Sequence, residues 1–425
     1  MRYGVLGGGA LGLTVAVRLA QHGNEVVLYE REPVPGGLAA GFPLGNAYLE
    51  KFYHHLFKTD RDAVELINEM GLGDRLVWRR PSTVMLRDGR LWPLDSAGAV
   101  LRFDPLPLRE RLRMGAVTAL LKVWPWYRVL EEDTASWWLS RWMGDAAFRS
   151  VWQPLLASKF GSFQNDIAMP WFWARVHYRT ASLGYLRGGF QQLYDSLTFR
   201  LAAHQAQVRL GTEVRAIRRE HGRLHVEADD GHEIFDRVVS TLPTRITMQL
   251  TPGLPEGYRD RFGGAKAYGA MCLILALSER LTRAYWINIG DSGYPFQPLV
   301  EHTNLMPSAD YHGYHLLYLG NYLPMDSELM SASKEEVLAQ FLPHLTALNP
   351  SFRQDWVRES WLYKAPFAQP IVTREFARTI PPHVTPLPGL FMANMFQIYP
   401  QDRGQNYSIR MANRLVSWLQ TGLSA

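Results

Sequence analysis

The feature that most constrains this chain is a glycine-rich turn near its N-terminus. A short apolar run, residues 3–6, leads directly into Gly7-Gly8-Gly9-Ala10-Leu11-Gly12, and apolar residues then recur at helical spacing up to Gly23. A second apolar run, residues 26–28, is followed closely by Glu30. This order of strand, turn, helix and strand predicts a β-α-β unit at the start of a parallel sheet.

The spacing Gly7-x-Gly9-x-x-Gly12 predicts that this turn binds a dinucleotide. Glycine lets the chain turn sharply, lets backbone N–H groups approach a pyrophosphate at a helix N-terminus, and lets the helix pack closely on the sheet. Glu30 lies 18 residues after Gly12, where a carboxylate accepts hydrogen bonds from an adenosine ribose and repels a 2′-phosphate. We therefore expect a cofactor other than NADP. A turn that serves packing alone is the alternative interpretation.

The composition excludes several other classes of protein. The 425 residues are 47% hydrophobic and 20% charged, so we expect a globular chain of roughly two or three domains. The net charge of +5 is scattered along the sequence, which argues against nucleic acid and allows an anionic partner or a membrane face. Cys272 is the only cysteine, which excludes an intramolecular disulfide and a cysteine-based zinc site. We expect no metal, because the sequence also lacks an HExxH motif.

The apolar runs argue against secretion and membrane spanning. The N-terminus enters the glycine turn without the apolar stretch of a signal peptide, and so predicts a cytoplasmic setting. The longest apolar run, Ala267 to Leu277, has 11 residues, whereas a spanning helix needs roughly 20. Eight of the 14 tryptophans lie between Trp124 and Trp173. That density suits an apolar substrate tunnel, a peripheral membrane contact or plain helix packing.

The rest of the chain predicts two domains built from interleaved segments. The pattern is mainly helical from residue 60 to 184, with one hairpin at Asp88-Gly89, and short strands return between residues 208 and 241. Strands of a second sheet, a helix over 333–347 and a final strand, loop and helix follow. We expect an α/β fold in which one domain binds the cofactor and a mixed α+β domain binds the substrate. The expected boundaries are 1–70, 185–245 and 385–425 for the first domain, and 71–184 and 246–384 for the second.

Arg31 and the pair Gly36-Gly37 extend the glycine pattern. With Glu30 and the turn, they resemble the superfamily of FAD-binding amine oxidases, protoporphyrinogen oxidases and phytoene desaturases, which includes UDP-galactopyranose mutase. The resemblance implies a Rossmann-like, GR2-type domain for FAD, with the glycine pair along the pyrophosphate. Leu38 stands where the family usually has arginine, so one flavin-side contact of the family lacks its residue.

Segments further along the chain carry the same resemblance. Val214 is similar to the family valine whose backbone reads adenine, and residues 185–190, 236–243 and 389–394 resemble other segments of the FAD domain. Asn394 and Met395 replace the glycine and acid that usually follow the last of these, so the resemblance implies that the ribityl contact comes from Asn394 or Asp402, or is absent. Residues 402–408 open the last helix, whose N-terminal dipole would stabilise negative charge on reduced flavin. Residues 152–161 also look like a motif of bacterial protoporphyrinogen-oxidase-like proteins.

The residues that we expect to hold FAD share these motifs. They are Gly7, Gly9, Ala10, Leu11, Gly12, Glu30, Arg31, Gly36, Gly37, Leu38, Val214, Asn394, Asp402, Gly404, Asn406 and Tyr407. We expect the FAD to be non-covalent, because Cys272 lies in a strand far from the C-terminal motif.

Catalytic candidates come from a segment and from single residues. His54 and His55 lie in residues 50–57, which resemble the mutase segment that carries a histidine beside the flavin. Either could hydrogen-bond near N5 or relay a proton at neutral pH, and a histidine satisfied in a core turn is the alternative. Three aromatic residues could stack on the flavin ring and the substrate: Tyr399, Tyr407 and Trp361. Core packing is the alternative role for each of them. Three arginines could bind an anionic substrate group or the diphosphate: Arg175, Arg187 and Arg403. A solvated surface position is the alternative for each of them.

These features together predict an FAD-dependent oxidoreductase. We expect hydride transfer to flavin N5 from an apolar small molecule, either isoprenoid-, tetrapyrrole- or amine-like. One alternative is a mutase-like enzyme in which reduced flavin acts on a nucleotide sugar without net redox change. The other is a non-enzymatic protein like the Rab GDP-dissociation inhibitors, which share the fold without using flavin. The sequence leaves the electron acceptor and the oligomeric state open.

Overall fold

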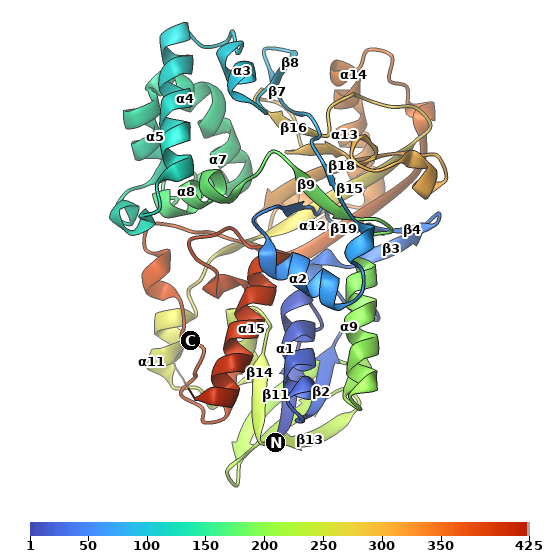
Figure 1. Cartoon of the computed structure of the whole chain (residues 1–425), viewed down its shortest axis with the longest axis vertical. Coiled ribbons are helices and arrows are strands. Elements are labelled where there is room, and N and C mark those ends of the chain that lie inside the picture. Colours follow the sequence, from blue (N-terminus) through green and yellow to red (C-terminus); the bar gives the residue numbers. More distant parts are fainter. Residues whose placement is uncertain (423–425) are drawn as a thin grey trace.

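A computed structural model describes residues 1–422 of the chain. The molecule has a lower region built on a parallel sheet and an upper region that combines a second sheet with a helical bundle (Figure 1). The chain passes between the two regions several times, as the mixture of colours in each region shows. The α/β class predicted from the sequence is confirmed.

The lower region is built on a five-stranded sheet with only parallel pairings. Its strands, in spatial order, are β10 (Gln207–Leu210), β2 (Glu25–Glu30), β1 (Arg2–Leu6), β14 (Arg237–Ser240) and β20 (Leu390–Met392). One face is covered by α1 (Ala10–Gln21), α9 (Gln191–Ala203) and α15 (Gln405–Thr421), where α1 packs against both other helices. The first β-α-β unit therefore forms as the sequence predicts.

The other face of this sheet is covered by a three-stranded antiparallel sheet, which lies within the segment where the sequence predicts short strands. Its strands are β11 (Val214–Glu220), β12 (Arg223–Ala228) and β13 (Gly231–Phe235). Apolar residues of both sheets share one buried cluster, in which Val27, Ile217 and Val226 are fully buried. Each such side chain contributes roughly 1.5–3 kcal/mol to stability. Burial on both faces explains why β1 and β2 are nearly continuous apolar runs.

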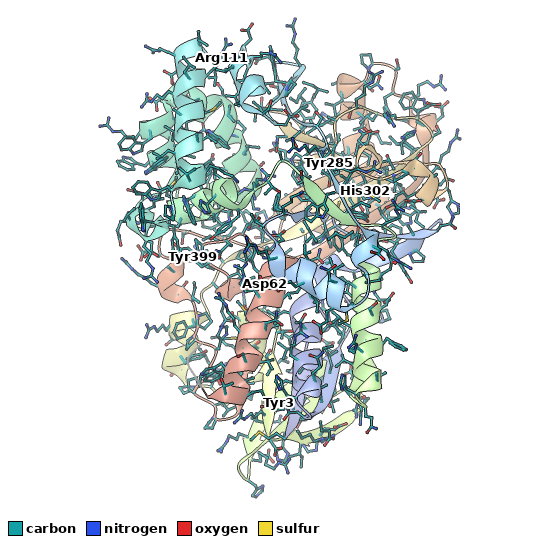
Figure 2. The ribbon with its side chains drawn as sticks, in the orientation of Figure 1. Tyr3, Asp62, Arg111, Tyr285, His302 and Tyr399 are labelled. Carbon is teal, nitrogen blue, oxygen red and sulfur yellow. The ribbon has the colours of Figure 1, made fainter. Side chains whose placement is uncertain are left out.

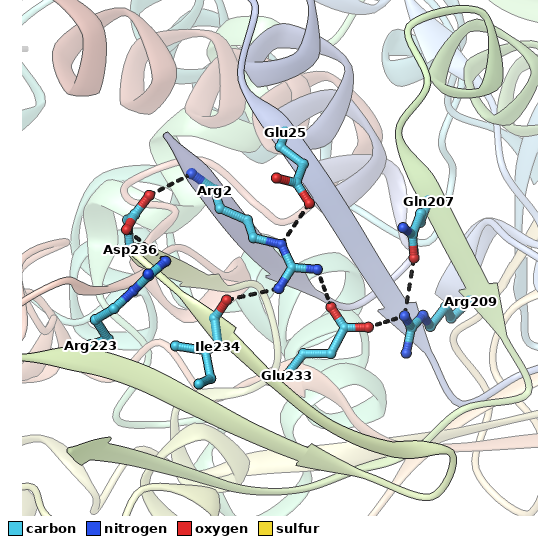
Figure 3. Close-up of polar contacts among 8 residues, drawn as sticks. All are labelled: Arg2, Glu25, Gln207, Arg209, Arg223, Glu233, Ile234 and Asp236. Atoms are coloured by element: carbon cyan, nitrogen blue, oxygen red, sulfur yellow. Dashed lines mark hydrogen bonds and ion pairs between the residues drawn. The ribbon is translucent and has the colours of Figure 1, made fainter. Parts of the chain in front are cut away.

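A polar network closes the outer end of the lower region (Figure 3). The guanidinium of Arg2 donates to Glu25 at 2.6 Å and to the carbonyl of Ile234 at 2.9 Å, and it pairs with Glu233. Glu233 also pairs with Arg209. These contacts join β1, β2, β10 and β13, and so fix the small sheet against the parallel one.

The upper region contains a seven-stranded sheet. Its strands, in spatial order, are β19 (Val357–Pro370), β15 (Ala267–Leu277), β18 (His315–Leu323), β17 (Leu299–Glu301), β16 (Trp286–Ile289), β7 (Thr83–Arg87) and β8 (Arg90–Pro93). The hairpin predicted at Asp88-Gly89 is confirmed, since β7 and β8 pair antiparallel across it. The long edge strand β19 is absent from the sequence prediction.

Helices lie at two places beside this sheet (Figure 1). The bundle at the upper left consists of α3 (Ala97–Leu101), α4 (Leu108–Val123), α5 (Ala135–Met143), α6 (Asp145–Ala147), α7 (Gln153–Phe160) and α8 (Met169–Tyr178). The other group is α12 (Glu328–Ser331), α13 (Lys334–Phe341) and α14 (Leu345–Leu348). The single helix predicted over 333–347 is wrong in detail, because the chain leaves the α-helix around Pro343, whose nitrogen cannot donate a helix hydrogen bond.

Short elements lie around and between the two regions. They are β3 (Gly41–Leu44) paired with β4 (Ala47–Glu50), β5 (Leu56–Phe57) and β6 (Leu76–Arg79) on either side of β9 (Leu183–Leu186), and the helices α2 (Arg61–Glu69), α10 (Thr244–Leu250) and α11 (Glu256–Phe262). Within residues 1–422 no helix combines the length and the hydropathy needed to cross a bilayer.

Candidate active site

A cavity of about 1190 Å³ extends from the lower region into the upper one. It begins at the glycine turn after β1, passes His54 and His55, and reaches α7 and α8 of the helical bundle. All sixteen residues that the sequence predicts for FAD border this cavity. Residues from both ends of the chain and from its middle therefore meet at one site.

The two glycine segments lie backbone to backbone at the lower end of the cavity. Gly9 and Gly36 form an isolated parallel bridge, and a Cβ on Gly37 would lie only 3.2 Å from the Cα of Gly9. A Cβ on Gly12 would lie 1.8 Å from the carbonyl oxygen of Gly7, so α1 can approach β1 this closely only with glycine there. The first N–H groups of α1 have no helical partners, and the residues that carry them, Ala10 and Leu11, border the cavity.

Glu30 is held rigidly at the end of β2. One carboxylate oxygen accepts the N–H of Gly8 at 2.6 Å, and the other accepts the N–H of Glu32 at 2.9 Å. The side chain is buried and borders the same end of the cavity as Val214. The acid expected from the sequence is therefore presented to the cavity by the backbone around it.

The N-terminal turn of α15 presents two amide donors without partners. Asn406 accepts the N–H of Ala63 at 3.1 Å, and Gln405 accepts the hydroxyl of Tyr194 at 2.6 Å. The Nδ2 of Asn406 and the Nε2 of Gln405 are buried and make no hydrogen bond within the described residues. Both residues border the cavity, and such orphaned donors indicate space for an acceptor group.

Asn394 has a different environment from the one expected. It borders the cavity, but its side-chain oxygen accepts the N–H of Phe396 at 3.0 Å, and its amide donates to Thr244 at 3.2 Å. The side chain is thus engaged in the local turn after β20. The orphaned amides of α15 are better placed to meet a ligand.

Both candidate histidines border the cavity and are held in its wall. The Nδ1 of His54 lies 2.6 Å from the carbonyl oxygen of Phe52, and the Nδ1 of His55 lies 3.2 Å from the hydroxyl of Tyr285. Burial lowers the pKa of His54 to about 4 and, with the nearby charge of Arg179, that of His55 to about 3. Both rings are therefore neutral at neutral pH. Neutral rings suit the expected hydrogen bonding and make the expected proton relay at that pH unfavourable.

A cluster of cations surrounds Asp402 at the upper end of the cavity. The Nζ of Lys159 lies 2.5 Å and the Nη1 of Arg175 lies 2.8 Å from the same carboxylate oxygen. Although burial alone would raise the pKa of Asp402, these cations hold it well below its usual range. Arg403 donates to the hydroxyl of Tyr322 at 2.9 Å. Asp402 and Arg403 were expected from the C-terminal motif, whereas Lys159 was overlooked within the quoted segment 152–161.

Three predicted site residues do not border the cavity. Arg187 is exposed in the turn after β9, and Trp361 packs against Phe42 with ring centroids 5.1 Å apart. Tyr399 lies at the lower edge of the helical bundle (Figure 2), against Tyr127 and Phe376. Tyr407 does border the cavity. Sequence patterns could not separate these positions, because aromatic and arginine residues are frequent in both environments.

Cys272 borders the cavity although it is far from the C-terminal motif in sequence. Distance along the chain was therefore a poor reason to separate it from the cofactor. The thiol is buried in β15, and burial raises its pKa far above neutral, so it stays protonated. No group of three or more metal-binding side chains occurs among the residues that the structure describes.

The fold and the site define a protein with a long cavity that runs from a parallel-sheet region into a second region. The chain belongs to the family of flavin containing amine oxidoreductases, whose model matches residues 12–400. Membership supports an oxidoreductase that acts on a small molecule, and it implies a flavin cofactor.

Curated relatives match only part of their own length. Carotenoid phi-ring synthase of Streptomyces griseus is 26% identical over 285 residues, which cover 59% of this chain and 54% of that protein. The 15-cis-phytoene desaturase of Synechococcus elongatus is 26% identical over 159 residues, which cover 33% of each chain. The matches thus span about half or less of these relatives.

Solved structures share the fold over nearly the whole chain. A provisionally assigned protoporphyrinogen oxidase from Exiguobacterium sp. 255-15 has a TM-score of 0.78 at 18% identity, covering 99% of both chains. Reduced UDP-galactopyranose mutase has a TM-score of 0.76 at 15% identity, covering 100% of this chain and 96% of that one.

The residues around the cavity fit a flavin dinucleotide. The glycine segments leave a side-chain-free groove beside the N-terminus of α1, which suits a pyrophosphate. The orphaned amides of Asn406 and Gln405 suit acceptor atoms at the start of α15. The groove and the orphaned amides are features of the structure, and both agree with the flavin cofactor that the family implies.

Proposed function

We propose that this chain binds FAD non-covalently along the cavity and oxidises or desaturates an apolar substrate. The observation that carries the proposal is the shape of the cavity, which joins a glycine-lined groove at α1 to the start of α15. Its upper part is walled by Trp152, Leu155 and Phe172. Apolar walls favour an apolar body and exclude water from the site.

Bound flavin would supply the acceptor for a hydride. The chain would hold it with the N–H groups of α1 around the pyrophosphate, Glu30 at the ribose, and the amides of α15 near the ring. Neutral His54 and His55 would supply uncharged hydrogen bonds beside the reacting groups. The protonated thiol of Cys272 is a poor nucleophile, which supports a non-covalent complex.

The visible spectrum of the purified full chain tests this proposal. We expect the two absorption bands of oxidised flavin, release of FAD on heat denaturation, and anaerobic bleaching by a prenyl hydrocarbon but not by a nucleotide sugar. Colourless protein that takes up no FAD would contradict the proposal and favour a non-enzymatic role. Turnover of a nucleotide sugar only after reduction with dithionite would favour the mutase-like alternative.

We also propose that the helical bundle contacts an anionic lipid bilayer. Nine of the 15 exposed large hydrophobic side chains within the described residues lie between positions 101 and 142. Val123, Trp126 and Val129 are exposed by 73%, 64% and 67%. Arg128 and Arg141 are exposed in the same segment, and within the described residues neither forms an ion pair. Exposed apolar and cationic side chains together are typical of an interface with anionic lipid.

The position of α4 connects this surface with the cavity. Thr118 of α4 borders the cavity, while Leu112 and Leu120 of the same helix are exposed. One helix therefore separates the exposed apolar surface from the apolar part of the cavity. This arrangement supports uptake of an apolar substrate from lipid.

A further inference from the structure

The upper end of the cavity carries more positive than negative charge. Lys159, Arg175, Arg179 and Arg403 border it near a single carboxylate, that of Asp402. The other acid nearby, Asp60, is turned to the backbone N–H of Phe57 at 2.8 Å. Lys159, Arg175 and Arg403 are partly buried, whereas Arg179 is exposed at the cavity wall. An excess of partly buried positive charge is unfavourable unless an anion enters the site.

The protein satisfies only part of the donor capacity of these cations. Lys159 has three N–H donors and uses one on Asp402, and Arg175 likewise donates to that carboxylate through Nη1. Within the described residues the guanidinium of Arg179 forms no ion pair or hydrogen bond, and it lies 5.8 Å from the ring centroid of Phe57. Several donors are therefore free to meet one group inside the cavity.

Burial and nearby charges shift the pKa values of groups in this cluster. Burial lowers the pKa of Lys159 to about 8, against the attraction of Asp402. Although burial alone would raise the pKa of Tyr322, Arg403 and Lys159 lower it. Each of these shifts would be opposed by an added anion.

We propose that Lys159 and Arg179, together with Arg175, form a subsite for an anionic oxygen group on an otherwise apolar substrate. The proposal rests on the proposed function, because it assumes that the substrate body occupies the apolar part of this cavity. Arginine and lysine in such an arrangement bind carboxylate and phosphate alike. The substrate class is therefore an amphiphile with one acidic end.

Three compounds with the same alkyl chain test the subsite on the full-length protein: dodecanoate, dodecyl phosphate and dodecanol. Calorimetric titration would measure their affinities at neutral pH. We expect at least one of the two anions to bind about tenfold or more tightly than dodecanol, which corresponds to one charge-assisted hydrogen bond. The stronger of the two anions distinguishes a carboxylate from a phosphate subsite.

Two variants assign the effect to the cluster. Arg179→Met and Lys159→Met should each reduce the preference for the anion about tenfold and leave the affinity for dodecanol unchanged. Arg187→Met, at an exposed position outside the cavity, is the matched control and should behave as the native protein. Unchanged dodecanol binding shows that the variants are folded.

Other results would overturn the subsite. Equal affinity for dodecanol and both anions, or an unaltered preference in both variants, would do so. Loss of flavin from the variants with unchanged anion binding would instead assign the cations to the cofactor. The flavin spectrum of each preparation separates these outcomes from failure of the proposed function, in which even the native protein would hold no FAD.

Discussion

At the scale of single residues, burial decides the charge state of the histidines. His302 is fully enclosed between aromatic side chains, and its Nε2 lies 2.8 Å from the hydroxyl of Tyr311. Burial lowers its pKa to about 3, whereas an unfolded chain has a histidine pKa of about 6.5. At pH values between these two pKa values, His302 therefore binds a proton in the unfolded chain but not in the folded chain.

We expect His302 to reduce stability as the pH falls. Between pH 7 and pH 5 its contribution should lower the free energy of unfolding by about 2 kcal/mol, because protonation stabilises only the unfolded chain. In His302→Gln, which keeps a donor for Tyr311, this part of the pH dependence should vanish. Urea unfolding of both proteins at the two pH values measures the difference. An identical loss of stability in both would show that His302 is protonated in the folded state.

Single residues also show where sequence analysis succeeds. Gly9, Gly12 and Gly37 could be predicted, because their spacing is a local pattern. Close backbone contacts at Gly12 and Gly37 leave no room for a side chain. The grouping of Lys159 and Arg179 could not be predicted, because it arises only when α7 and the end of α8 meet the C-terminal loop. Trp361 and Arg187 show the reverse case, in which a residue type suited to a site lies outside the cavity.

At the scale of elements, the start of α15 is the clearest site feature. This helix carries the orphaned amide of Asn406 at its N-terminus, where the helix dipole is positive. The last strand and the last helix of the chain were predicted because they follow a motif and have a regular apolar period. The edge strand β19 was missed, since its sequence mixes charged, aromatic and proline residues and lacks strict alternation.

Replacing the donor of Asn406 should weaken flavin binding. Asn406→Asp keeps an acceptor for the N–H of Ala63 but replaces the free N–H group with an oxygen. We expect the Kd for FAD to rise about tenfold or more, from loss of one donor and addition of negative charge. Titration of the apoprotein with FAD measures it.

Asn413 provides the control on the same helix. Its side-chain oxygen accepts from Arg18 at 2.9 Å, so Asn413→Asp also keeps its contact, and it does not border the cavity. Its affinity for FAD should equal that of the native protein. Equal weakening by both variants would assign the effect to the helix as a whole.

At the scale of the whole molecule, the helical bundle concentrates the exposed apolar surface. Interleaving of two regions was predicted from the positions of the motifs, and the residue boundaries given for the two domains stay a prediction. The exposure of the bundle could not be predicted, because tryptophan density fits a core and a surface equally well. Trp173 is buried and Trp126 is exposed within the same segment.

The exposed surface should bind vesicles that contain phosphatidylglycerol. Replacing Val123, Trp126 and Val129 together by serine should reduce the bound fraction by about tenfold or more, because each loses apolar area that lipid would cover. Phe199→Ser is the control, since Phe199 is 78% exposed but lies on α9. Co-sedimentation measures binding. Native protein that stays in the supernatant would contradict the membrane proposal.

The order of strands in the parallel sheet has a consequence for biosynthesis. A ribosome delivers β1 and β2 first, but β20 pairs with β14, and α15 packs on α1, only after residue 390 has emerged. Until then the nascent chain exposes an unpaired edge at β14 and lacks one wall of the cavity beside α1. A premature stop codon before the last helix would therefore yield a chain that chaperones and proteases can recognise, however much of it has been translated.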